Sequence, residues 1–196
     1  MVKKTRVSHL LHQKTPVQRR TVIKHFKQHR EEVIKYFDPC LTLLEDDYDY
    51  DVVVSYMFSR LENAHREILY YGIVVLHDVS TKLAYKAIDL HDLTRKDFKE
   101  KFSKVYGFDI PKSLTKKIES AEAVRDRILH GKSPETGKRA QAVLDTLEYF
   151  DGLDEKIYEQ ANIWIAGDRR GIKGAKTPLS DATSRWVLMG MGLTLS

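Results

Sequence analysis

The run from Ala123 to Lys132, which reads AVRDRILHGK, contains the residues best suited to chemistry. Arg125 is followed directly by Asp126, and His130 lies five residues after the arginine. An arginine matches phosphate oxygens through paired hydrogen bonds, and a histidine exchanges a proton near neutral pH. These residue types suit acid–base chemistry on a phosphate-containing substrate. A structural role is the alternative, because cationic side chains are also favoured in the last turn of a helix.

The order of an arginine, a polar residue, three further residues and a histidine resembles the motif of the HEPN superfamily, whose members are all-α bundles. The resemblance covers residues 52–165 and includes Gly131 and Lys132 directly after the histidine. It also includes the loop that follows and an amphipathic segment containing Ala142, Leu144, Leu147, Tyr149 and Phe150.

The resemblance implies a metal-independent endoribonuclease that needs no cofactor and acts as a homodimer. By that resemblance, Arg125 would hold the scissile phosphate and stabilise its extra charge. His130 would move protons to or from the 2′-hydroxyl and the leaving oxygen, and Asp126 would be the polar residue after the arginine. Because RNA carries its own 2′-hydroxyl nucleophile, the substrate would be RNA rather than DNA.

Two further expectations come from the resemblance alone. Many members are toxins or phage-defence proteins, so an antitoxin or another defence-system protein is an expected partner. Other members keep the fold without activity, so a noncatalytic RNA-binding or dimerisation scaffold is the competing hypothesis. Independently of the resemblance, a helical protein whose basic segment docks an acidic partner is a third hypothesis.

Helix geometry supports a dimer independently of the resemblance. Residues five apart lie about 140° apart around a continuous helix, so Arg125 and His130 do not share a face. Asp126 and His130 are four apart and do share one, which lets an aspartate orient a histidine or form an ordinary structural pair. One copy of the motif is therefore poorly arranged for catalysis, and two copies across a two-fold axis are better arranged.

The elements around the motif are predicted to be helices, because apolar residues recur at helical spacing and no alternating strand pattern is found. We expect a helix over residues 16–37 and a long helical stretch over 52–90 that is either continuous or broken near Gly72. Shorter helices are expected over 94–106 and 113–130, the latter ending at Gly131. A further helix is expected over 138–164.

This pattern predicts an all-α, HEPN-like bundle of four to five helices with two appendages. The predicted parts are a basic arm over residues 1–14, the helical domain over 15–166, and a basic linker with an apolar C-terminal segment over 167–196. The chain has 196 residues and one cysteine, Cys40, which excludes an internal disulfide. No apolar run spans a bilayer and no secretory signal is found, so we expect a cytoplasmic protein without membrane association.

The net charge of +5 is unevenly distributed. Residues 1–30 carry nine Lys and Arg and no acidic residue, whereas the remainder has a net charge of −4. The basic segment predicts contacts with an anionic partner. The candidate RNA-binding residues are Arg20, Lys24 and Lys27 in this segment and Arg127 and Lys132 beside the motif. A basic segment that folds next to the motif would guide RNA to it, whereas one on the far side would serve a different partner.

Other candidates have ordinary explanations. Glu62 and Arg66 are four apart and suit an intrahelical ion pair, although Glu62 or His65 could instead reach the motif. Asp47, Asp49 and Asp51 begin like a calcium loop but lack its later glycine and glutamate, so a solvated loop or a helix N-cap is expected. The histidine-containing basic segment, with His9, His12, His25 and His29, has no nearby carboxylate before Glu31, so we assign no metal site.

Overall fold

The computed structural model describes residues 16–91, 93–167, 172 and 174–195. The predicted basic arm over residues 1–14 lies outside the described residues, as do Arg169, Arg170 and Lys173 of the predicted linker.

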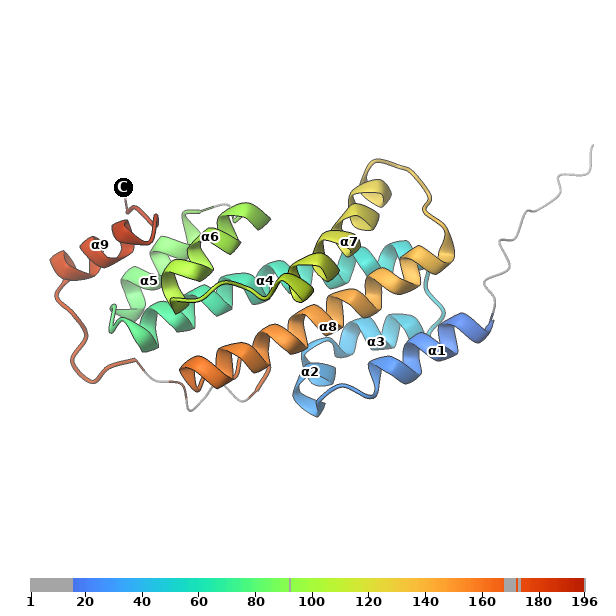
Figure 1. Ribbon diagram of the computed structural model, residues 1–196, viewed down its shortest axis with the longest axis horizontal. Helices are drawn as coiled ribbons and strands as arrows, with labels where there is room; N and C mark the ends of the chain where they lie inside the picture. The colour runs from blue at the N-terminus through green and yellow to red at the C-terminus, as the bar shows by residue number, and fades with distance from the viewer. Residues whose placement is uncertain (1–15, 92, 168–171, 173, 196) are drawn as a thin grey trace, which may run out of the picture.

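All regular elements in the described part are helices, which confirms the all-α class, and they number nine rather than four to five (Figure 1). They are α1 (Pro16–Phe26), α2 (Glu31–Tyr36), α3 (Asp38–Glu45), α4 (Tyr50–Leu76), α5 (Thr81–Asp89), α6 (Arg95–Tyr106), α7 (Lys112–Leu129), α8 (Thr136–Ala161) and α9 (Asp181–Gly190). Among them, none is long and apolar enough to cross a membrane.

The helix count rises because two predicted helices are each divided and because α3 and α9 were not among the predicted helices. The single helix expected over residues 16–37 is wrong: the chain leaves α1 after Phe26 and begins α2 at Glu31, with Arg30 in an extended conformation at the N-cap. The stretch over residues 52–90 is divided after Leu76 rather than near Gly72. Ser80 sets the second boundary, because its hydroxyl accepts a hydrogen bond from the Leu83 backbone N–H at 3.4 Å.

Gly72 lies inside α4 for a packing reason. A Cβ atom built on Gly72 would lie 2.5 Å from Val105 Cγ1 and 2.8 Å from Tyr106 Cζ, both on α6. The missing side chain lets α6 approach α4 closely, and the Tyr106 hydroxyl donates a hydrogen bond to the Ile68 carbonyl at 2.7 Å. The glycine therefore marks a helix contact and not a helix end.

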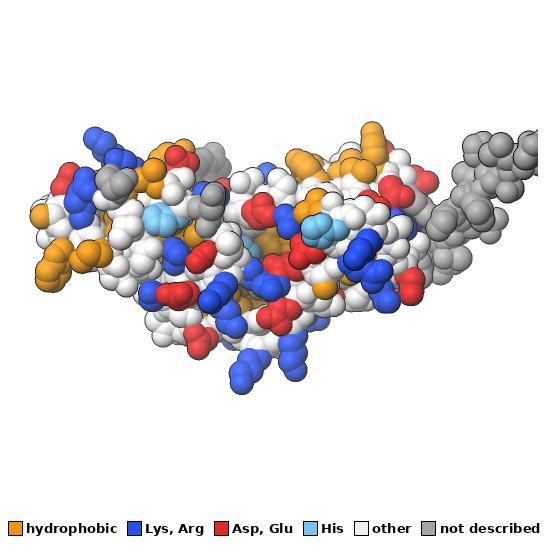
Figure 2. All heavy atoms as spheres, turned by 90° about the horizontal axis from the view of Figure 1, so that it is seen from above, with side chains coloured by type: hydrophobic (Ala, Val, Ile, Leu, Met, Phe, Trp, Pro, Cys, Tyr) orange, Lys and Arg blue, Asp and Glu red, His pale blue; other side chains and the backbone are white. Residues whose placement is uncertain are grey.

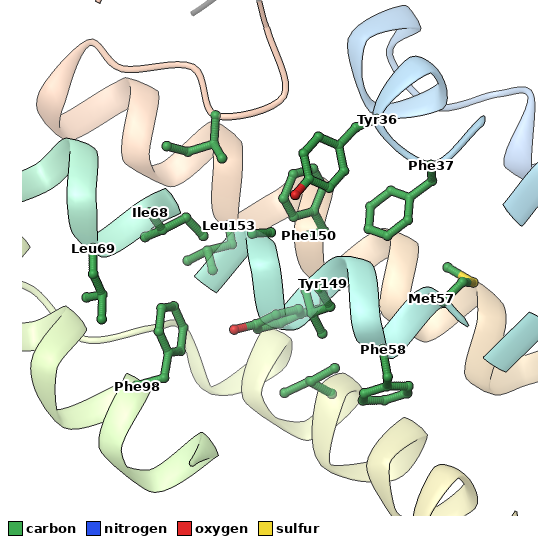
Figure 3. Close-up of a cluster of buried hydrophobic side chains, with 14 of the residues drawn as sticks. Tyr36, Phe37, Met57, Phe58, Ile68, Leu69, Phe98, Tyr149, Phe150 and Leu153 are labelled. Atoms are coloured by element: carbon green, nitrogen blue, oxygen red, sulfur yellow. The ribbon is translucent and has the colours of Figure 1, made fainter. Parts of the chain in front are cut away.

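The two longest helices, α4 and α8, form the centre of the molecule. They pack against each other, α7 and α1 pack on α8, and α3, α5 and α6 pack on α4. Figure 3 shows the core between them, where Phe150 of α8 stacks on Tyr36 at 5.0 Å between ring centroids and meets Phe37 edge-on at 5.2 Å. This arrangement fixes α7, which carries the motif, against both central helices.

An ionic cluster ties the turn between α1 and α2 to α8. We call it the junction cluster: Arg30, His29, Asp151, Asp154 and Trp164. Arg30 donates to Asp151 at 2.7 Å and to Asp154 at 2.9 Å, and His29 Nδ1 lies 2.7 Å from Asp151. The Arg30 guanidinium lies over the Trp164 ring, 4.1 Å from its centroid. The cluster holds three segments together that are far apart in sequence.

Burial controls the acidity of the junction cluster. Burial raises the pKa of Asp154 above its usual value, even though the Ile165 backbone N–H donates to it at 2.6 Å. Burial acts in the same direction on Asp151, but the hydrogen bonds from His29 and Arg30 outweigh it and leave the pKa of Asp151 lowered. Asp154 is therefore a costly buried carboxyl whose partners must all be present.

The C-terminal segment packs on α5 through α9. Leu188, Met191 and Leu193 of this segment are buried, whereas Trp186 and Met189 are exposed. Cys40 of α3 is also fully buried.

Candidate functional site

The motif borders a cleft of about 470 Å³, which we call the motif cleft. Phe58 and Leu61 of α4 contribute apolar surface to it, and Leu93 and Thr94 precede α6 at its edge. Its polar lining consists of Glu62 and His65 from α4, Arg95 and Lys96 from α6, and Glu122, Arg125 and Asp126 from α7. Figure 2, which views the side of α6 and α7, shows acidic and basic side chains intermixed around a hollow.

Arg125 reaches into the motif cleft and contacts two carboxylates. It donates through Nη2 to Glu62 Oε1 at 3.0 Å and through Nη1 to Asp126 Oδ1 at 3.3 Å. Its guanidinium lies 5.7 Å from the centroid of the Phe58 ring. The arginine is thus oriented by α4, although both of its ionic partners are exposed side chains that a stronger anion could replace.

The expected ion pair between Glu62 and Arg66 is wrong. Glu62 pairs with Arg125 instead, and Arg66 donates to the Ile88 carbonyl at 3.1 Å. The alternative in which Glu62 reaches the motif therefore describes the structure. Glu62 and Arg125 are 63 positions apart in sequence, so only the packing of α4 on α7 brings them together.

Sequence reasoning missed the wall that α6 contributes to the motif cleft. Arg95, the first residue of α6, forms an ion pair with Glu122 of α7 across the cleft. Lys96 also lines this wall. The lining therefore carries three basic and three acidic side chains, so the cleft has no net charge of its own.

His65 forms part of the floor of the motif cleft. Its ring stacks on Phe98 with 3.7 Å between centroids, and its Nε2 lies 3.1 Å from the Tyr149 hydroxyl. Burial lowers the pKa of His65 to about 3, so the imidazole is neutral at physiological pH. A neutral, packed histidine supports the shape of the cleft and does not serve as a cation for phosphate.

The structure does not bring His130 into the motif cleft. Helix α7 remains helical to Leu129, and His130 forms its exposed C-cap before Gly131, which has a φ of 69°. The His130 backbone N–H donates to the Asp126 carbonyl at 3.0 Å, but the Asp126 carboxylate turns toward Arg125. Within the described residues, the His130 imidazole has no hydrogen-bond or ion-pair partner.

An apolar surface lies next to this end of α7. We call it the motif-end patch: Val52 and Tyr56 of α4 with Ile128 and Leu129 of α7. A shallow groove lined by Val52, Tyr56 and Ile128 runs between the two helices. Leu129 directly precedes His130 and is 58% exposed. Exposed apolar side chains gathered in one place are typical of surfaces that another protein covers.

The predicted RNA-binding residues fall into two separate places. Arg127 and Lys132 are exposed beside the motif, whereas Arg20 and Lys24 are exposed on α1 and Lys27 is exposed in the turn directly after it. Helix α1 packs on α8 and α3, and Figure 1 shows α1 and α7 on opposite sides of α8. Lys27 already pairs with Glu45 at 2.6 Å. The described basic residues of α1 therefore do not border the motif cleft.

The acidic run before α4 is an N-cap, as expected. The Asp49 carboxylate accepts a hydrogen bond from the Asp51 backbone N–H at 2.9 Å. Both aspartates also pair with the buried Arg139 at 2.9 Å, and Asp47 pairs with Arg19 at 3.0 Å. Across the part of the chain that the structure describes, His, Cys, Asp and Glu side chains form no group of three that could hold a metal ion.

Comparisons with protein-family models, with curated proteins and with solved structures returned no match for this chain. The functional argument therefore depends on the residues and their geometry.

Proposed function

We propose that this protein is a metal-independent endoribonuclease of HEPN type that acts as a homodimer. The observation that carries the proposal is the division of the motif: Arg125 and Asp126 line a cleft, whereas His130 is exposed outside it beside the motif-end patch. A second copy docked on that patch would bury apolar surface and bring a second exposed histidine close to the motif.

The proposed reaction uses groups that RNA and the protein both provide. His130 accepts the proton of a 2′-hydroxyl, and the 2′-oxygen attacks the adjacent phosphorus. The bond from phosphorus to the 5′-oxygen breaks, the leaving oxygen takes the proton that His130 accepted, and the products are a 2′,3′-cyclic phosphate and a 5′-hydroxyl. Arg125 stabilises the additional negative charge on the phosphate, and Asp126 helps to orient Arg125.

Within this proposal, Glu62 competes with the substrate. Its Oε1 atom lies 3.0 Å from Arg125 Nη2, in the position that a phosphate oxygen would take. Because this ion pair is exposed to solvent, exchanging the carboxylate for a phosphate costs little. Arg127 and Lys132 would contact the RNA backbone outside the cleft. Arg20, Lys24 and Lys27 would contact a more distant part of the same RNA.

The test is RNA cleavage by clean single variants. We expect His130→Ala and Arg125→Ala each to reduce cleavage by a factor of about 10²–10⁴, with unchanged thermal unfolding and dimer mass. His25→Ala is the matched control, because His25 is an exposed histidine on α1. Cleavage that persists in His130→Ala protein would contradict the assignment.

Mixing the two inactive variants tests whether the site is composite. A mixed dimer of Arg125→Ala and His130→Ala chains keeps one intact pair if arginine and histidine come from different copies. We therefore expect partial recovery of cleavage in the mixture and none in either variant alone. A mixture that stays inactive argues against a shared site.

A noncatalytic RNA-binding or dimerisation scaffold is the second candidate. It is favoured by the balanced charge of the motif cleft and by the two carboxylates that already hold Arg125. In that case Arg125→Ala weakens RNA binding and the unmodified protein forms no cleavage products. A toxin or phage-defence role and an antitoxin partner are proposals that rest on the family resemblance, and a cytoplasmic location is a proposal that rests on the sequence composition.

A further inference from the structure

A second pocket, separate from the motif cleft, lies between α4 and α5. We call it the tyrosine pocket. It has a volume of about 360 Å³, and its lining residues are Arg66, Glu67, Tyr70 and Tyr71 of α4 with Tyr85, Ile88 and Asp89 of α5. It shares no lining residue with the motif cleft. The proposed ribonuclease activity gives this pocket no role.

Three tyrosines line the pocket. The rings of Tyr70 and Tyr71 lie 5.1 Å apart between centroids at an interplanar angle of 74°, so they form two walls of a corner. Tyr85 on the opposite helix is 67% exposed. Burial raises the pKa of Tyr70, with a smaller contribution from the neighbouring Tyr71.

The charged groups of the tyrosine pocket leave it negative. Glu67 accepts a hydrogen bond from the Tyr36 hydroxyl at 3.1 Å. Asp89 is exposed at the last position of α5. Arg66 is the one basic residue of the lining, and the Ile88 carbonyl accepts a hydrogen bond from its guanidinium at 3.1 Å.

We propose that the tyrosine pocket binds the cationic side chain of an arginine or lysine from a basic partner polypeptide. Aromatic rings attract cations through the negative faces of their π systems, and the exposed Asp89 carboxylate supplies charge complementarity. A phosphate group would instead meet two carboxylates. A purely apolar side chain would make no ionic contact with Asp89.

The first experiment compares two peptides that differ by one charge. The probes are acetyl-Gly-Arg-Gly-amide and the same peptide with citrulline, which has the shape of arginine without its charge. Each is titrated into the full chain while amide chemical shifts are followed by NMR. We expect saturable shifts at residues 66–89 with the arginine peptide and affinity at least tenfold weaker with citrulline. Equal affinities, or no shifts in this region, would overturn the proposal.

The second experiment separates an aromatic contact from simple burial. Tyr85→Phe keeps the ring and Tyr85→Leu removes it, and neither threatens the core because Tyr85 is exposed. We expect the phenylalanine variant to bind the arginine peptide as the unmodified protein does and the leucine variant to bind five- to tenfold more weakly, a range of about 1–1.4 kcal/mol. Asp89→Asn should weaken binding by a smaller factor of two to three, about 0.4–0.7 kcal/mol. Unchanged affinity in both Tyr85→Leu and Asp89→Asn would contradict a site at this pocket.

A nucleic-acid control completes the test. A short single-stranded RNA is titrated under the same conditions. Shifts confined to the region of the motif cleft leave the tyrosine pocket proposal intact. Shifts at Tyr70, Tyr71 and Tyr85 with RNA but not with the arginine peptide would overturn it.

Discussion

The junction cluster and the motif cleft use the same chemistry in opposite settings. In each, one arginine contacts two carboxylates: Arg30 meets Asp151 and Asp154, and Arg125 meets Glu62 and Asp126. The Asp154 side chain is completely buried, whereas the side chains of Glu62 and Asp126 are 56% and 60% exposed. The difference separates charges that hold the fold from charges that are free to change partners.

The physical reason is the solvent around each pair. A buried carboxyl that loses its cation has no water to replace it, and breaking such a pair costs about 3–5 kcal/mol. An exposed pair exchanges readily with water and contributes about 0–1 kcal/mol. Sites that bind external anions are therefore expected among exposed pairs such as that of Arg125, and not at the junction cluster.

The largest effect is expected from Arg30→Ala. This change leaves Asp154 without its cation, so we expect the free energy of unfolding to fall by about 3–5 kcal/mol. We expect Arg30→Lys to lower the free energy of unfolding by less than Arg30→Ala, because lysine keeps the positive charge. It still lowers it, because lysine lacks the forked geometry of the guanidinium. Urea unfolding followed by circular dichroism measures both.

Arg125→Ala is the matched control for Arg30→Ala. It also removes an arginine from two carboxylates, and we expect it to change the free energy of unfolding by less than about 1 kcal/mol. Equal losses of unfolding free energy in the two alanine variants would contradict the distinction between the junction cluster and the motif cleft.

His65 should link stability to pH with an intermediate effect. Its pKa is lowered to about 3 in the folded protein by burial, against about 6.5 in the unfolded chain, so below pH 6.5 only the unfolded state gains the proton. Stability therefore falls as the pH is lowered. The expected loss from this group between pH 7.5 and pH 5 is about 2 kcal/mol.

The double variant His65→Phe with Tyr149→Phe isolates this contribution. It keeps two aromatic rings in the core and removes both ends of the hydrogen bond, so that neither polar group is left unpaired. Unfolding free energies measured at both pH values should differ less in this variant than in the unmodified protein. An identical pH dependence in the two proteins would show that His65 is protonated in the folded state.

The smallest effect is expected from Glu62→Gln. This change weakens the competitor for Arg125, so RNA affinity should rise about three- to fivefold at low salt, with little change in stability. Glu148→Gln is the matched control, because Glu148 pairs with Lys117 outside the motif cleft and the change in net charge is identical. A gain in both variants would indicate a general charge effect, and loss in Glu62→Gln would indicate that Glu62 holds Arg125 in its binding position.

Local signals in the sequence predicted the helical class and several boundaries. Thr94 caps α6, Gly107 ends it with a φ of 75°, and Gly131 follows α7 with a φ of 69°. These residues act through their own backbone and neighbours, so they can be recognised without a structure. The division after Leu76 was missed because Gly72 gave a stronger breaker signal than Ser80.

The candidate site was less predictable, because its contacts join distant segments. Arg125 and Asp126 were identified from their types and spacing, but the pairing with Glu62 and the wall formed by Arg95 arise from helix packing. The prediction that His130 lies on another face than Arg125 agrees with a cleft that Arg125 lines and His130 does not. RNA cleavage by these residues stays a prediction.

The buried cysteine has a practical consequence for studying assembly. Cys40 has no exposed surface, and burial raises the pKa of its thiol to about 12, so it forms almost no reactive thiolate at neutral pH. A cysteine introduced at an exposed position such as Ser133 would then be the only site open to maleimide dyes or spin labels. Spectroscopic distances between labels on two copies can therefore be measured with Cys40 left in place.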